Sequence, residues 1–247
     1  MPFAFYNDTD EYCCTWLENL ISARIIPYGV VDSTPIQKLK PSTLAKFTQV
    51  HLFAGMGGWA YALRLAAWPD AKPVWTGSCP CQPFSNIGQR RGFKDSRHLW
   101  PYESKLIAQC RPPVIFGEQI AGATVWLDTV FSNLETHGYA CGAANLPSAS
   151  VGTQHIRQRL WFVADANQAR WTNVKRQSAP QEKADFRPAT RVVPSQKIEH
   201  LPGPSQPDPS WITDGLSGEG FAVGAYGNSI VPQLAAEFIT ACADLLL

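Results

Sequence analysis

The chain has 247 residues, of which 45% are hydrophobic and 17% are charged, and its formal net charge is +1. This balance is typical of a folded globular protein and excludes a disordered chain. If the partner is a nucleic acid, the positive charge has to gather on one face, because the whole chain supplies no strong field.

The composition also bears on location and metal binding. No apolar run approaches the roughly 20 residues of a membrane-spanning helix, and residues 1–12 lack the basic and apolar regions of a secretory signal. Seven irregularly spaced cysteines indicate reduced thiols, and Cys79 and Cys81 have no second Cys/His pair at zinc-ligand spacing. We therefore expect a cytoplasmic protein without a metal, associated with the nucleoid if it is prokaryotic or phage-encoded.

The first quarter of the chain alternates short apolar runs with a helical pattern. Residues 3–6 predict a strand, and apolar side chains at helical spacing predict a helix over residues 11–23. Residues 30–32 predict the end of a second strand, and residues 36–45 are irregular or loosely helical.

A buried strand at residues 48–53 leads into a glycine-rich turn, FAGMGG at residues 53–58, and then into an apolar helix at residues 59–67. This order suits a nucleotide-like ligand, because glycines let the backbone approach and a helix amino terminus offers free N–H donors. Taken alone, the turn is explained equally well as a tight connection between a strand and a helix.

The stretch TGSCPCQPFSNIGQRRGFKDSRHLWPY, residues 76–102, follows a short apolar run. A cysteine just past a strand and beside a cationic segment suits a thiolate nucleophile that acts on an anionic polymer. An isolated cysteine in a loop is more often an ordinary packed thiol.

The second half of the chain continues the alternation and then changes composition. We expect helices over residues 102–110, 124–138 and 233–247, and strands over residues 114–116, 139–145 and 160–164. Arg157 and Arg159 project to one side as the last strand begins. Residues 165–215, rich in Pro, Gln, Ser, Lys and Arg, predict either a partly disordered linker or a reduced recognition segment.

Several of these motifs together resemble those of the cytosine-C5 DNA methyltransferases. The matching phrases are FAGMGG, PCQPFS with GFKDSR, Glu-Gln-Ile at residues 118–120, the two arginines, and GNSI at residues 227–230. The sequence departs from the family at Gln119, where the family has Asn, and at His155, where the family has Gln. The resemblance implies an α/β, Rossmann-like S-adenosylmethionine-dependent methyltransferase fold, with a mostly parallel sheet flanked by helices and a small irregular recognition segment.

The resemblance also implies domains and site residues. It gives a first catalytic part at residues 1–164, a variable target-recognition or linker segment at 165–215, and a closing motif and helix at 216–247. The implied catalytic residues are Cys81, Glu118, Arg157 and Arg159. The implied ligands of S-adenosylmethionine are Phe53, Ala54, Gly55, Met56, Gly57, Gly58, Asp8, Asp32, Pro80, Leu99, Asn228 and Ser229. The implied DNA-binding residues are Gln82, Ser85, Arg90, Arg91, Lys94 and Arg97.

The order of the motifs is unusual for this family, in which the glycine turn comes first. Only about 20 residues separate Gly58 from Cys81, too few for two further strand–helix units. Asp8 and Asp32 resemble the acidic residues that follow the second and third strands, so we predict a permuted sheet that opens at strand two. The right-handed crossover rule then places the helix after the glycine turn on the opposite face from usual.

The roles of the two acidic residues stay open at this point. Turn or helix-cap duty explains Asp8 and Asp32 about equally well, and Asp70 is the alternative ribose ligand. The function that the resemblance implies is methyl transfer to carbon 5 of cytosine in double-stranded DNA, through a flipped-out base, by a monomer of the restriction-modification type. The alternatives are the same chemistry on RNA and a non-catalytic DNA-binding relative.

Overall fold

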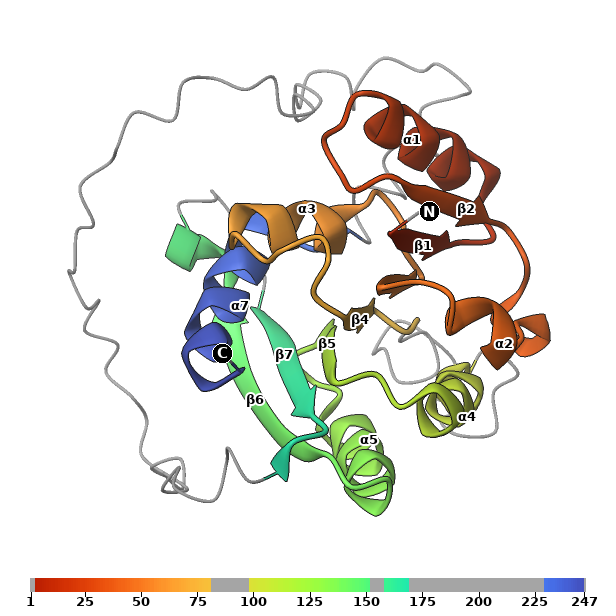
Figure 1. Ribbon diagram of the computed structural model, residues 1–247. Coiled ribbons are helices and arrows are strands. Elements are labelled where there is room, and N and C mark those ends of the chain that lie inside the picture. The colour runs from red at the N-terminus through yellow and green to blue at the C-terminus, as the bar shows by residue number, and fades with distance from the viewer. Residues whose placement is uncertain (1–2, 81–97, 152–157, 169–228, 247) are drawn as a thin grey trace, which may run out of the picture. The chain divides into compact units, whose positions relative to one another are not determined.

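The computed structural model describes residues 3–80, 98–151, 158–168 and 229–246 (Figure 1). The chain divides into two units, Met1–Asn173 with Ala225–Leu247, and Val174–Gly224. The second unit lies outside the described residues, and the first is described by itself. The predicted boundaries at residues 164 and 215 stay a prediction.

A seven-stranded sheet in the order β2-β1-β3-β4-β5-β7-β6 forms the centre of the described part. Its strands are β1 (Ala4–Asn7), β2 (Gly29–Asp32), β3 (Gln49–Leu52), β4 (Val74–Gly77), β5 (Val114–Ile120), β6 (Ala140–Pro147) and β7 (Gln158–Asp165). The five strands from β2 to β5 are parallel, and β7 runs antiparallel to both of its neighbours. This mostly parallel sheet with its covering helices is the α/β, Rossmann-like arrangement that the sequence predicts.

Helices cover both faces of the sheet. They are α1 (Glu11–Ser22), α2 (Pro41–Leu44), α3 (Gly58–Leu65), α4 (Trp100–Cys110), α5 (Thr124–Thr136) and α7 (Pro232–Leu246), with short 3₁₀ turns η1 (Ile36–Lys38) and η3 (Ser148–Val151). Figure 1 shows α1, α3 and α7 on one face and α2, α4 and α5 on the other. None of the helices in the described part is long and apolar enough to cross a membrane.

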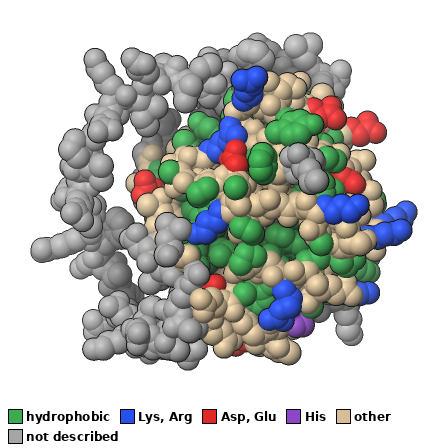
Figure 2. Space-filling view, viewed as in Figure 1, with side chains coloured by type: hydrophobic (Ala, Val, Ile, Leu, Met, Phe, Trp, Pro, Cys, Tyr) green, Lys and Arg blue, Asp and Glu red, His purple; other side chains and the backbone are tan. Residues whose placement is uncertain are grey.

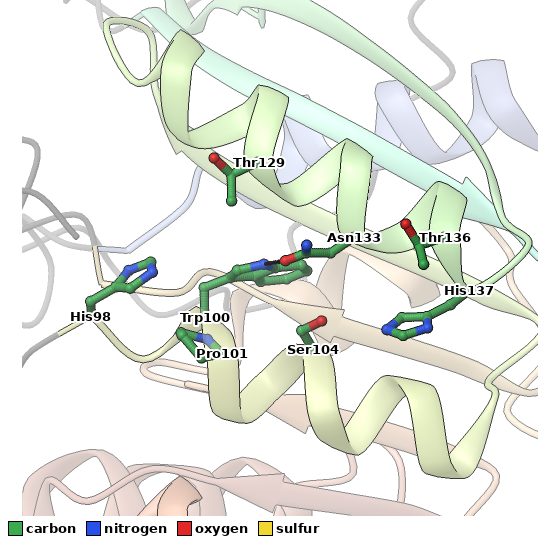
Figure 3. A pocket seen from close by; sticks show the side chains of 8 residues that line it. All are labelled: His98, Trp100, Pro101, Ser104, Thr129, Asn133, Thr136 and His137. Atoms are coloured by element: carbon green, nitrogen blue, oxygen red, sulfur yellow. Dashed lines mark hydrogen bonds between the residues drawn. The ribbon is translucent and has the colours of Figure 1, made fainter.

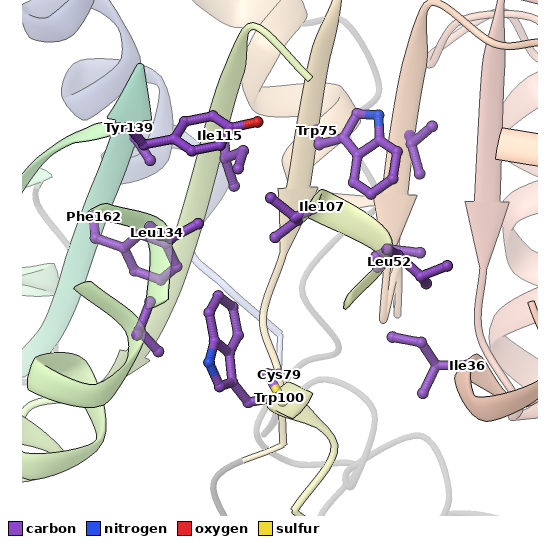
Figure 4. Packing of buried hydrophobic residues seen from close by; sticks show 14 of the residues in the cluster. Ile36, Leu52, Trp75, Cys79, Trp100, Ile107, Ile115, Leu134, Tyr139 and Phe162 are labelled. Atoms are coloured by element: carbon purple, nitrogen blue, oxygen red, sulfur yellow. The ribbon is translucent and has the colours of Figure 1, made fainter. Parts of the chain in front are cut away.

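Each face has its own core. On the face of α4 and α5, the buried residues include Trp75, Trp100, Ile107 and Phe162 (Figure 4). On the face of α3 and α7, aromatic rings stack and meet edge to edge, for example Trp59 against Trp161 with centroids 5.5 Å apart. The apolar runs of the strands are thus buried on both sides, as expected for a parallel sheet.

The predicted permutation is confirmed by the strand order. In a doubly wound sheet of order 3-2-1-4-5, the first strand lies in the middle and carries the glycine turn. Here β3 occupies that place, β1 and β2 stand where the second and third strands belong, and β4 and β5 follow on the other side. The chain therefore enters the sheet at the second strand of the usual order.

The prediction for the face of α3 is wrong. The connections through α2, α3 and α4 all lead in the same direction along the sheet. Helices α2 and α4 lie on one face, whereas α3 lies on the opposite face, with α1. Parallel connections that step alike and share a hand put their helices on the same face. The connections through α1, α2 and α4 all have one hand, so β3–α3–β4 is the exception, of the left-handed kind found in only about 2% of cases.

Basic side chains do not gather into one patch on the face shown in Figure 2. Lys and Arg side chains lie scattered there among hydrophobic and acidic ones on the described part of the surface. The cationic segment that the sequence assigns to DNA, residues 85–97, lies outside the described residues, which resume at residue 98. The expected basic face thus stays a prediction.

Candidate active site

The parallel strands bring several predicted site residues to one edge of the sheet. In their register, Asn7 lies beside Leu52, Leu52 beside Gly77, and Gly77 beside Gly117. The residues that follow these positions meet at the carboxyl-terminal edge, where ligands bind in open α/β sheets. They are Asp8 after β1, Phe53 after β3, Ser78 after β4 and Glu118 in β5.

The glycine turn after β3 leaves room for a ligand against its backbone. Phe53 and Gly55 have φ angles of 52° and 51°, in the left-handed region that glycine adopts without strain. The backbone N–H of Gly55 donates to Oδ2 of Asp8 at 2.8 Å. Within the described part of the chain, a Cβ atom at Gly55 would have no neighbour closer than 4.0 Å, so these residues leave the turn open on that side.

Asp8 ties the end of β1 to the glycine turn, and helix capping falls to Asp10. Oδ1 of Asp10 accepts hydrogen bonds from the N–H groups of Tyr12 and Cys13, at 2.9 and 3.2 Å. Oδ1 of Asp8 accepts from the N–H of Asp10 at 3.0 Å, while its Oδ2 holds Gly55. Asp8 therefore has a turn role and, in addition, a direct link to the predicted cofactor turn.

Asp32 lies at the end of the neighbouring strand, close to Asp8 in the backbone. The N–H of Asp8 donates to the carbonyl of Asp32 at 3.3 Å, and the amide of Asn7 donates to the carbonyls of Asp32 and Thr34, each at 2.8 Å. Oδ1 of Asp32 accepts from the N–H of Thr34 at 2.7 Å. The geometry thus puts both acidic residues at the edge that carries the glycine turn.

Asp70, the alternative ribose ligand, lies at the other edge of the sheet. Its carboxylate pairs with Arg64 at 2.9 Å. Its backbone carbonyl accepts from the side chain of Gln49, the first residue of β3, at 3.3 Å. Because β3 and β4 are parallel, this position is at their amino-terminal ends, and the Asp70 alternative is wrong.

The closing helix packs beside the glycine turn. Helix α3 begins at Gly58, and its capping residue Gly57 supplies no side-chain hydrogen bond. A Cβ atom at Gly58 would lie only 2.7 Å from Cγ1 of Ile230, which precedes α7. Only glycine permits this approach, so the segment that follows Ser229 is fitted directly against the start of α3.

An ion pair between a buried carboxylate and a partly buried guanidinium occupies the end of β5. Nε of Arg159 lies 2.8 Å from Oε1 of Glu118, and the two side chains are 23% and 8% exposed. Arg159 pairs with Ile120 across the antiparallel ladder, and Glu118 pairs with Trp161. The two charged residues are therefore diagonal neighbours on one sheet face, and the structure brings together two predicted catalytic side chains.

Glu103 lies beside the end of β4, and the sequence did not lead us to predict this position. It lies on α4, is 4% exposed, and its Oε1 would be 2.5 Å from a Cβ atom at Gly77. Burial raises the pKa of this carboxyl group to about 8. The signal was present in the sequence, because Glu103 shares helical spacing with the apolar Leu106 and Ile107.

A separate hollow lies between α4 and α5. It has a volume of about 300 Å³ and is lined by polar and aromatic side chains, among them His98, Ser104 and His137. Figure 3 shows Trp100 at its floor, where Nε1 donates to Oδ1 of Asn133 at 2.9 Å. None of the predicted site residues that the structure describes lines this hollow, and the candidate active site is the sheet edge described above.

Several predicted residues are only partly placed or are not described. Leu99 is half-buried and packs against the core on the α4 face, and Pro80 and Ser229 are half-buried at the ends of described segments. The predicted residues outside the described part are Cys81, Gln82, Ser85, Arg90, Arg91, Lys94, Arg97, Arg157 and Asn228. Their roles stay predictions. No group of three or more metal-ligating side chains occurs among residues 3–80, 98–151, 158–168 and 229–246.

The fold and this edge define an α/β protein with a glycine turn of the kind that suits a nucleotide-like ligand. A model of the C-5 cytosine-specific DNA methylases matches residues 69–214, more than half of the chain. The chain belongs to the C-5 cytosine-specific DNA methylase family.

Individual relatives are similar over part of their length. The type II methyltransferase M.NgoMIV of Neisseria gonorrhoeae is 32% identical over 107 residues, which are 40% of this chain and 33% of that protein. M.AplI of Arthrospira platensis is 23% identical over 186 residues, 60% of this chain and 54% of that protein. Among solved structures, DNMT2 of Spodoptera frugiperda has a TM-score of 0.48 and 16% identity, covering 70% of this chain and 45% of that chain. The chain thus spans about a third to a half of these relatives.

Proposed function

We propose that this chain transfers a methyl group from S-adenosylmethionine to carbon 5 of cytosine in DNA. The observation that supports it most directly is the ion pair between Glu118 and Arg159 at the end of β5. It stands beside β4, which leads through residues 78–80 to Cys81. A carboxylate and a guanidinium at the end of this strand suit the recognition of a pyrimidine, and a thiol suits the attack on it.

The residues at the sheet edge fit the methyl donor. S-adenosylmethionine, when bound, supplies an electrophilic methyl group. The open backbone at Gly55 and the start of α3 suit close approach of its polar parts. The carboxylates of Asp8 and Asp32 suit ribose hydroxyls, which carboxylates bind at strand ends in this type of fold. Further proposed contacts are those of residues 53–58, Pro80, Leu99, Asn228 and Ser229.

The chain's own residues would carry the reaction on the base. Carbon 5 of cytosine is a poor nucleophile until another nucleophile adds at carbon 6, and the Cys81 thiolate is suited to that addition. Glu118 would hold the N3 edge and the exocyclic amine, and Arg159 the O2 side. Arg157 would help to position the base or the cysteine loop. After transfer, loss of the carbon-5 proton allows the thiolate to leave and restores the aromatic ring.

The proposed partner is duplex DNA from which the target base is flipped out, at a cost of a few kcal/mol. Arginines and lysines of the segment at residues 85–97 would hold the sugar–phosphate backbone in that state, so binding should weaken as salt rises. The proposed contacts are those of Gln82, Ser85, Arg90, Arg91, Lys94 and Arg97. By analogy with the type II methyltransferases among its relatives, we propose a role in DNA modification.

The test is methyl transfer from labelled S-adenosylmethionine to varied duplex DNA and to tRNA, with base-resolution mapping of the product. We expect 5-methylcytosine in DNA; label in tRNA alone would indicate the RNA alternative, and no label a binding protein. Cys81→Ser should abolish transfer but keep cofactor binding. Cys110→Ser is the matched control, since its thiol lies on α4 facing the carbonyl of Pro41. Full activity of Cys81→Ser would refute the nucleophile.

A further inference from the structure

Two hydrogen bonds grip the short segment that leaves β4. Nε1 of Trp59, on α3, donates to Oγ of Ser78 at 3.0 Å. Nε2 of Gln119, on β5, donates to the backbone carbonyl of Cys79 at 3.0 Å. Both donors belong to nearly buried side chains, 4% and 3% exposed, so solvent does not compete for these contacts.

The two donors reach the segment from opposite faces of the sheet. Trp59 belongs to the core on the α3 and α7 face. Successive side chains of a strand alternate between the two faces of the sheet, so Gln119 lies on the same face as Ile115, four residues earlier in β5. Ile115 belongs to the core on the α4 and α5 face. The Cys79 side chain is also buried in the core on the α4 and α5 face, beside Trp100 (Figure 4). The segment is therefore held on both sides.

Gln119 is also fixed at its other end. Its Oε1 accepts a hydrogen bond from the N–H of Ile120 at 3.0 Å, so both the nitrogen and the oxygen of the side-chain amide are engaged. This is the position where the resemblance puts Asn, whose side chain is one methylene shorter. The longer side chain gives the amide its reach from the end of β5 to the carbonyl of Cys79.

We propose that Trp59 and Gln119 are positioning residues that clamp Ser78–Cys79 and so fix the base of the loop carrying Cys81. The inference rests on the proposed function. Cys81 follows Cys79 by two residues, and consecutive Cα atoms are about 3.8 Å apart. Covalent geometry therefore limits the distance between the Cys81 thiol and the held Ser78–Cys79 segment. Small misplacements of a nucleophile cost rate, because reaction requires a near-attack geometry.

The chain offers a matched control for each donor at the opposite edge of the sheet. Trp68 is as buried as Trp59, and its Nε1 donates to the carbonyl of Lys72 at 3.2 Å. Gln49 is fully buried, and its Nε2 donates to the carbonyl of Asp70 at 3.3 Å. Replacing these donors removes the same kind of hydrogen bond far from the proposed reaction.

The experiment compares Trp59→Phe with Trp68→Phe and Gln119→Met with Gln49→Met. Each change removes the donor and leaves an apolar side chain in its place. We expect kcat for methyl transfer to fall about ten- to a hundredfold in the first member of each pair, with KM for S-adenosylmethionine within about twofold. Trapping on duplexes that contain 5-fluorocytosine should slow in parallel. The controls should keep kcat within about twofold.

Amide hydrogen exchange supplies a readout that does not need activity. Exchange in peptides that contain Ser78–Cys79 should become about tenfold faster in Trp59→Phe and Gln119→Met, and stay unchanged in the two controls. The clamp is refuted if the two members of each pair lose kcat equally. It is also refuted if exchange in this segment does not change in Trp59→Phe and Gln119→Met. If the wild type neither methylates nor traps any nucleic acid, the proposed function fails, and hydrogen exchange still decides whether the clamp exists.

Discussion

Replacing the buried carboxyl of Glu103 by an amide should make the protein more stable, increasingly so as the pH rises. Glu103 is 4% exposed, and burial raises its pKa from 4.5 to about 8. Between these two values the folded state keeps a proton that the unfolded state has lost. The stability that this proton provides is complete below pH 4.5 and declines as the pH rises to about 8.

The size of the effect follows from the pKa difference. Each unit of pKa corresponds to about 1.36 kcal/mol, so the carboxyl group costs on the order of 3 kcal/mol at pH 7 and somewhat more above pH 8. The amide of Glu103→Gln has nearly the same shape and carries no charge at any pH. The free energy of unfolding of the variant should therefore exceed that of the wild type by little at pH 4.5 and by about 3 kcal/mol at pH 7.

Urea unfolding at pH 4.5, 6, 7 and 8 measures this difference. Glu135→Gln is the control, because Glu135 is exposed on the neighbouring helix α5 and its replacement should change stability by no more than about 0.5 kcal/mol. A gain from Glu103→Gln that is equal at every pH would mean better packing and not proton linkage. A gain below about 0.5 kcal/mol at pH 8 would show that the carboxyl is solvated, and the reasoning from burial would be refuted.

Two further predictions concern the ion pair and the glycine at the start of α3. Arg159→Met should lower the free energy of unfolding by about 1–3 kcal/mol and abolish most methyl transfer, because it removes the guanidinium that neutralises the buried Glu118 carboxylate; adding Glu118→Gln should restore stability but not activity. Gly58→Ala should cost about 1–3 kcal/mol in thermal or urea unfolding, since its Cβ would press on Ile230, whereas Gly122→Ala, which meets no atom of the described residues within 4 Å, should be neutral; equal effects would contradict the packing.

The sequence predicted the permuted sheet from a simple length argument. Too few residues separate Gly58 from Cys81 for two further strand–helix units, and the missing strands had to lie upstream. Asp8 follows the first of these strands and Asp32 ends the second, and the structure links Asp8 to the glycine turn and Asp32 to Asp8. Motif spacing was sufficient here because it constrains covalent chain length, which does not depend on packing.

Contacts between elements distant in sequence could not be predicted in the same way. The approach of Glu103 to Gly77 and the hydrogen bond from Trp59 to Ser78 depend on how α4 and α3 are seated on the sheet. The periodicity of a helix tells which residues face inward, but not which backbone group each one meets. The prediction of Asp70 as an alternative ribose ligand was wrong for the same reason. Asp70 follows helix α3 in the sequence, and only the fold shows that the chain has by then returned to the amino-terminal ends of β3 and β4.

The left-handed β3–α3–β4 connection shows which preference prevails when handedness and packing disagree. On its present face, α3 buries Trp59 and Leu63 against α7 and the sheet, and Ala60 against α1. Full burial of one large apolar side chain contributes about 1.5–3 kcal/mol. A move of α3 to the other face would remove its contacts with α7 and α1, and α3 would meet α2 and α4 there.

The crossover rule reflects the usual ease of closing a connection, and the eight residues from Ala66 to Pro73 let the chain return to β4 from the less common side. Keeping α3 on this face also keeps the glycine turn at its amino end beside Asp8 and Ile230. The position of the helix therefore follows from the contacts of α3 and of the glycine turn, and the handedness of the connection is a consequence of them.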